Sequence, residues 1–102
     1  MASHILHLRI KVPNTKDELF SFLRDAIPYY ESPGGVRVRL LRSLEDPSRF
    51  VEIVEYDSRE AFDNDQRRVN EDPRMRSYLQ AWRSLLVGDV QVESYEDVTD
   101  QL

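Results

Sequence analysis

The stretch from Phe50 to Phe62 constrains the fold of this chain more than any other. Residues 50–56 are rich in aromatic and β-branched side chains, a composition that predicts a β-strand. Asp57 and Ser58 follow at once, and both are residue types that favour the N-terminus of a helix. Glu60 stands three positions after Asp57, which is the spacing of a capping box. A strand that leads into a capped helix without an intervening loop predicts a rigid corner of an α+β domain.

The segments on either side of this corner show the patterns of further strands and helices. Apolar and polar residues alternate in three more segments, which predicts strands over residues 3–12, 36–43 and 90–95. A first helix is expected to end before Pro28, because the residue preceding a proline avoids the α region, and Tyr29 and Tyr30 then fall in a loop. After the corner the helix restarts at Asp72-Pro73, and an apolar stripe from Met75 to Leu86 is followed by the terminator Gly88.

The resulting order of elements, β-α-β-β-α-β, predicts an α+β fold of the ferredoxin-like, split βαβ kind with an antiparallel sheet. One face of this sheet takes the helices. Strand alternation places a mixed set of side chains on the other face: Ile5, His7, Arg9, Arg37, Arg39, Leu41, Gln91 and Glu93. That face is either left in solvent or covered by a second subunit. The strand at 50–56 is apolar on both faces, so the pattern leaves open which face meets the helices.

Length and charge restrict the class of protein. With 102 residues, we expect a single domain over residues 1–102 with an acidic tail at about 96–102. The net charge of −5 argues against nucleic acid as a partner. The sequence has no apolar segment of about 18 residues, so we expect no membrane span and a cytoplasmic protein.

Residue composition also argues against a metal site. The chain has no cysteine, and its only histidines are His4 and His7. Three positions apart on a strand, these two side chains point to opposite faces and cannot share an ion. We therefore predict no bound metal.

Residues 55–62 carry a resemblance to a known family. Here an aromatic residue closes a strand, and Ser58 and Ala61-Phe62 then open a helix. This pattern resembles the dimeric α/β-barrel superfamily and, within it, the antibiotic biosynthesis monooxygenase family, which commonly has tryptophan where this chain has Tyr56. The order of elements matches from Ile5 to Tyr95. Other members carry a histidine early in the following helix, and the best match here is Asp65.

The resemblance implies a homodimer in which two ferredoxin-like subunits pack sheet against sheet into a closed barrel. It implies a monooxygenase that needs no cofactor and oxidises a small aromatic or quinol-like substrate. Haem is the alternative cofactor, because the branch includes haem-degrading oxygenases. A different class of function is also open: the same dimer would bind a small hydrophobic ligand, or serve as a stress or assembly module, without turnover.

Two candidate catalytic residues follow. Tyr56 matches an aromatic residue near the pocket of the resembled family, where its hydroxyl would orient a phenol or carbonyl; alternatively it caps the edge of the sheet. His7 is a candidate general acid–base, because histidine titrates near neutral pH, or else an interface residue.

Four candidate substrate-binding residues complete the set. Tyr78 and Trp82 would line a pocket, although their helical spacing equally suits core packing. Arg37 and Arg39 would bind a carboxylate or enolate, since guanidinium forms bidentate pairs with such anions. Their plainer role is pairing across strands or subunits with an acid such as Glu52, Glu55 or Glu93.

Overall fold

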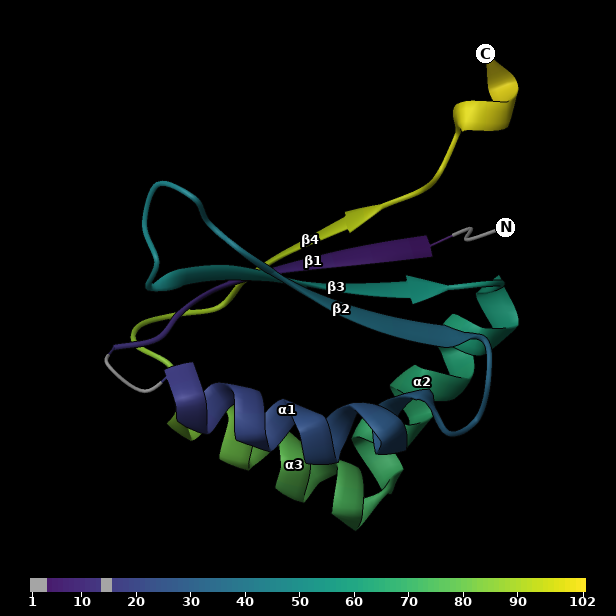
Figure 1. Ribbon diagram of the computed structural model, residues 1–102. Helices are drawn as coiled ribbons and strands as arrows, with labels where there is room; N and C mark the ends of the chain where they lie inside the picture. Colours follow the sequence, from purple (N-terminus) through teal and green to yellow (C-terminus); the bar gives the residue numbers. More distant parts are fainter. Residues whose placement is uncertain (1–3, 14–15) are drawn as a thin grey trace.

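The computed structural model describes residues 4–13 and 16–102 and has a four-stranded antiparallel sheet with three helices on one face (Figure 1). The strands run in the spatial order β2-β3-β1-β4, which confirms the predicted ferredoxin-like arrangement. Their bounds are β1 His4–Lys11, β2 Val36–Arg42, β3 Arg49–Tyr56 and β4 Gln91–Tyr95. The helices are α1 Lys16–Glu31, α2 Arg59–Glu71 and α3 Pro73–Ser84, and a short 3-10 turn, η1, covers Thr99–Gln101.

The predicted corner between β3 and α2 is present, and Ser58 rather than Asp57 caps the helix. The Ser58 side chain accepts a hydrogen bond from the Ala61 N–H at 3.1 Å. Asp57 instead donates its backbone N–H to the Gly35 carbonyl at 2.9 Å. Gly35 has φ +74°, and a Cβ added there would lie 3.1 Å from the Ala61 Cβ. The loop before β2 is therefore held directly against the start of α2.

Helix α1 continues through Pro28 to Glu31, so the predicted end before Pro28 is wrong. An internal proline removes one helical hydrogen bond. Contacts made by the residues that follow Pro28 in the helix offset this loss. The Arg68 guanidinium donates to the carbonyls of Tyr29 and Tyr30 at 2.7 and 3.0 Å. The Glu31 carboxylate accepts the Val38 N–H at 2.8 Å. Tyr29 and Tyr30 are thus helical, and neither lies in a loop.

The second half of the chain follows the predicted order with one shifted boundary. Asp72 caps α3 by accepting the Arg74 N–H at 2.9 Å, as expected for a helix that restarts at Asp72-Pro73. The helix ends at Ser84 with Leu85 as its C-cap, before the expected terminator Gly88. Gly88 lies in the connection to β4 with φ +73°. It therefore shapes the turn and not the helix end.

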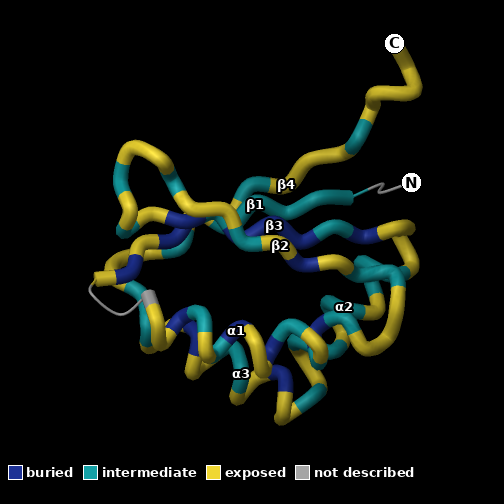
Figure 2. The backbone as a smooth tube through the Cα atoms, viewed as in Figure 1, coloured by how far each residue is buried: buried dark blue, intermediate teal, exposed yellow. Residues whose placement is uncertain are grey.

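Strand register decides which sheet face meets the helices. On β3, Phe50, Glu52, Val54 and Tyr56 point to the helices, with exposures of 2%, 5%, 9% and 1%. The core lies between this face and α1 and α3, as the dark blue positions in Figure 2 show. The opposite face carries the mixed set expected from alternation. The helices leave this outer face uncovered (Figure 1).

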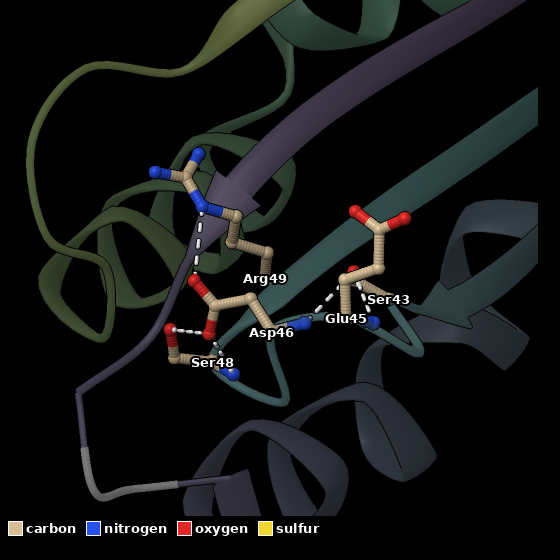
Figure 3. A network of polar contacts seen from close by, with 5 residues as sticks. All are labelled: Ser43, Glu45, Asp46, Ser48 and Arg49. Atoms are coloured by element: carbon tan, nitrogen blue, oxygen red, sulfur yellow. Dashed lines mark hydrogen bonds and ion pairs between the residues drawn. The ribbon is translucent and has the colours of Figure 1, made fainter.

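The connection between β2 and β3 is closed by its own polar side chains (Figure 3). The Ser43 hydroxyl accepts the N–H groups of Glu45 and Asp46, each at 3.2 Å. Asp46 in turn accepts the Ser48 hydroxyl at 2.6 Å and pairs with Arg49 at 3.1 Å. This is the predicted turn, and it fixes the register of the β2–β3 hairpin.

Over residues 4–13 and 16–102, no helix is both long enough and apolar enough to cross a membrane.

We expect Arg68→Ala to destabilise the protein by roughly 3 kcal/mol, because it removes two charge-assisted hydrogen bonds and leaves two carbonyls of α1 without that donor. Urea unfolding measures this loss. Arg67→Ala is the matched control on the same helix, since the Arg67 side chain is exposed and, among the described residues, bonds only Asn64. Equal effects of the two substitutions would contradict the role given to Arg68.

Candidate functional site

A cavity of about 130 Å³ lies between the helix-facing side of the sheet and helices α2 and α3. Its wall is largely apolar and includes Leu6, Leu8, Val38, Val54, Met75 and Leu79. Five polar side chains share that wall: Tyr30, Glu52, Tyr56, Asp65 and Gln66. An apolar cavity with a few convergent polar groups is the usual form of a small-molecule site.

Glu52 is a buried carboxylic acid in the middle of β3. It is 5% exposed, and its cross-strand neighbours are Leu8 on β1 and Leu40 on β2. Within the part of the chain that the structure describes, its Oε1 atom has no hydrogen-bond partner. Burial disfavours the charged form and raises the pKa of Glu52 to about 7. A carboxyl with this pKa exchanges a proton near neutral pH.

Tyr30 contributes a second buried polar group from the last turn of α1. It is 9% exposed, and no hydrogen-bond partner for its hydroxyl occurs among the described residues. Burial, and then the nearby charge of Glu52, raise the pKa of Tyr30. The phenol therefore stays protonated and can donate a hydrogen bond to whatever enters the cavity.

Tyr56 and Asp65 form a fixed pair at the cavity wall. The Tyr56 hydroxyl donates to Asp65 Oδ2 at 2.6 Å, and Arg68 Nη1 lies 3.5 Å from Asp65 Oδ1. Burial, followed by the hydrogen bond to Asp65, raises the pKa of Tyr56. Tyr56 thus lines the cavity with its hydroxyl donating to Asp65, and its catalytic role stays a prediction.

Tyr78 and Trp82 lie in the packed core and not in the cavity wall. The Tyr78 ring packs against Tyr30 with a centroid distance of 5.9 Å. Trp82 is 6% exposed and packs with Ile10 and Phe50. These positions match the packing alternative, while their roles as substrate-binding residues stay predictions.

The remaining candidates lie on the outer face of the sheet, away from this cavity. His7 packs against the Tyr95 ring at 4.7 Å, and Arg39 pairs with Glu55 at 2.7 Å. Arg37 stands on the same face, opposite Glu55 in the register. Glu52 points to the helices, so pairing of Glu52 with Arg37 or Arg39 within the sheet is ruled out. The structure brings Tyr56 into the cavity and leaves His7, Arg37 and Arg39 outside it.

Sequence reasoning missed the two most distinctive groups of the site, Glu52 and Tyr30. One signal was available for Glu52: it is a charged residue flanked on both sides by apolar residues within a strand. Tyr30 was missed because the helix was expected to end before Pro28, which placed Tyr30 in a loop.

The cavity does not fit haem. Its volume of about 130 Å³ is below that of an engineered cavity, ~150 Å³, that accommodates benzene. Neither histidine is part of its wall: His4 stacks on Phe62 at 3.9 Å, and His7 lies on the outer face. In the described ranges, no group of three His, Asp or Glu side chains is placed to hold a metal ion.

Comparisons with known proteins show the fold. No family model and no curated protein matches the sequence. Among solved structures, SnoaB from Streptomyces nogalater, a cofactor-independent oxygenase, superposes with a TM-score of 0.76 at 19% identity, over 95% of this chain and 94% of that one. A candidate antibiotic biosynthesis monooxygenase from Nitrosomonas europaea gives 0.77 at 16%, over 97% and 94%. A conserved protein from Methanosarcina mazei gives 0.78 at 14%, over 95% and 94%.

We expect Glu52→Gln to change how stability depends on pH. The folded state holds the Glu52 proton more tightly than the unfolded chain, so its contribution is fully present below pH about 4.5 and is lost as pH rises through about 7. Between pH 4.5 and pH 8 the wild type should lose roughly 3 kcal/mol relative to the variant. Urea unfolding across this range measures the difference.

Glu45→Gln is the control for this experiment, because Glu45 lies exposed in the β2–β3 turn. Its unfolding free energy should run parallel to that of the wild type. Parallel curves for Glu52→Gln as well would contradict the raised pKa.

Proposed function

We propose that this chain, which shares its fold with antibiotic biosynthesis monooxygenases, oxidises a small aromatic or quinol-like substrate with dioxygen and without a bound cofactor. The observation that carries the proposal is Glu52, a buried carboxyl with a pKa of about 7 in the wall of an apolar cavity. A general base works best when its pKa lies near the operating pH. Strongly shifted acids in clefts are candidates for such a role.

In this mechanism Glu52 removes the proton from a substrate hydroxyl. The resulting anion has carbanion character at a ring carbon, and that carbon supplies two electrons to dioxygen and forms a C–O bond. Glu52 returns the proton to the outer peroxide oxygen. Loss of the ring hydrogen as a proton then breaks the O–O bond, so that a phenol and dioxygen become a quinone and water. The substrate is the reductant, so the balance needs no other electron donor.

The cavity supports these steps through its largely apolar wall and its oriented donors. Its apolar wall strengthens electrostatic interactions with a developing anion. The Tyr30 hydroxyl is available to stabilise the oxyanion. Tyr56, held by Asp65, shapes the wall next to Glu52.

We also propose that the protein is a homodimer joined through the outer sheet face. Helices leave that face uncovered, and it carries partly exposed apolar side chains such as Leu41 and Tyr95, exposed to 46% and 45%. Burying this surface in a second copy would add to the modest core of a small domain.

One observation favours the alternative, a ligand-binding dimer without turnover. Asp65 stands where members of the resembled family carry a histidine, and its carboxylate accepts the Tyr56 hydroxyl and forms an ion pair with Arg68 at 3.5 Å. A residue held in this way can fix the shape of a pocket without exchanging protons with a ligand.

Oxygen-electrode measurements with phenols, hydroquinones and anthrones test the reaction. The wild type should consume oxygen above the buffer rate, and Glu52→Gln should lower kcat roughly 10²–10⁴-fold, the range for loss of a general base. Glu45→Gln should keep the wild-type rate. A folded wild type that consumes no oxygen with any of these compounds would support the alternative function.

Light scattering tests the dimer. We expect a mass of twice 12.1 kDa at micromolar concentration. Leu41→Asp should shift the protein toward the monomer, because it places a charge on the outer face. Leu44→Asp should not, because Leu44 lies in the β2–β3 turn and is 100% exposed. A stable wild-type monomer would contradict the proposal.

A further inference from the structure

We infer that the cavity binds an uncharged, single-ring phenol whose hydroxyl is held between Tyr30 and Glu52. This inference rests on the proposed function and narrows its substrate class. Three properties of the cavity carry it: its size, two unpartnered polar atoms that together match one hydroxyl, and the sign of the charges around it.

The cavity volume suits a single ring. The cavity volume of about 130 Å³ is close to that of an engineered protein cavity, ~150 Å³, that takes up benzene. Its opposing walls are Leu6 and Leu8 on β1 and Met75 and Leu79 on α3. The cavity is partly open to solvent, so the additional rings of a three-ring substrate would lie outside these walls and would not be packed by them.

Two of the three unpartnered polar atoms in the wall, those of Glu52 and Tyr30, are complementary to one hydroxyl. The third, Asp65 Oδ1, lies 3.5 Å from the Arg68 guanidinium. Glu52 and Tyr30 are each more than nine-tenths buried, and Glu52 Oε1 and Tyr30 Oη have no partner among the residues that the structure describes. A buried polar atom without a partner costs free energy, so both atoms favour a guest that bonds them. A phenol hydroxyl donates to the Glu52 carboxylate and accepts from the Tyr30 hydroxyl. The same hydrogen bond directs the hydroxyl proton of the substrate at the Glu52 carboxylate, which is the proposed base.

Charge excludes aromatic acids. Two carboxyl groups, Glu52 and Asp65, belong to the wall. The cation beside them, Arg68, is engaged by Asp65 and by the carbonyls of Tyr29 and Tyr30. A benzoate would bring a negative charge into an apolar space whose neighbouring cation is already used. A neutral phenol of the same size meets no such cost.

Calorimetric titration under nitrogen, where no turnover occurs, tests this inference with the full chain. We expect phenol and hydroquinone to bind, benzoate to bind at least 100-fold more weakly, and anthrone to bind no more tightly than phenol. Tyr30→Phe and Glu52→Gln should each weaken phenol binding about tenfold. Toluene, which fills the same space without a hydroxyl, should bind wild type and both variants equally.

Tyr29→Phe is the matched control, since it removes a hydroxyl from the same helix that bonds Asp72 outside the cavity. It should leave phenol affinity unchanged. Equal binding of phenol and toluene by the wild type, or tighter binding of benzoate, aniline or anthrone than of phenol, would overturn the inference.

The two proposals fail in different ways. Phenol that binds as described, with no oxygen uptake from any of the phenols, hydroquinones or anthrones in air, would defeat the monooxygenase and keep the single-ring binding site. Oxygen uptake with anthrones, together with no phenol binding, would keep the monooxygenase and defeat the single-ring site.

Discussion

The guanidinium of Arg68 contacts both helix α1 and a residue of the cavity wall. From α2 it reaches the last turn of α1, where it binds two backbone carbonyls, and it also lies beside the Asp65 carboxylate. The first contact supports the turn of α1 that carries Tyr30 into the core. The second holds the acceptor of the Tyr56 hydroxyl. One side chain thus positions groups from three elements around the same space.

Burial of the Glu52 carboxyl destabilises the folded state, and packing in the rest of the sheet offsets this loss. Every second residue of β3 points to the helices, so the position between Phe50 and Val54 must fall in the core. An apolar residue there would stabilise the fold more, because a buried carboxyl loses its hydration. A single internal residue that lowers the stability of the fold is typical of functional sites. The aromatic and aliphatic packing on either side supplies the stability that this position lacks.

The fold was predictable because its signals are local. The corner after β3 is encoded by adjacent residues, and strand alternation assigned the outer face correctly. Tyr56 could be placed near a pocket because its position matches an aromatic residue near the pocket of the resembled family. The continuation of α1 was not predictable, since the contacts that outweigh Pro28 come from Arg68, distant in the sequence. Glu52 was overlooked because both faces of β3 are apolar, and only the three-dimensional packing shows which face is covered.

The contact between Gly35 and Ala61 has a consequence for how this sequence can change. The two positions are separated by the whole β2–β3 hairpin, yet their backbones approach so closely that a single added methyl at Gly35 would lie 3.1 Å from the Ala61 side chain. A larger residue at either position therefore has room only if the loop and the helix move apart. Related chains that preserve this corner should keep both positions small, or should vary them together.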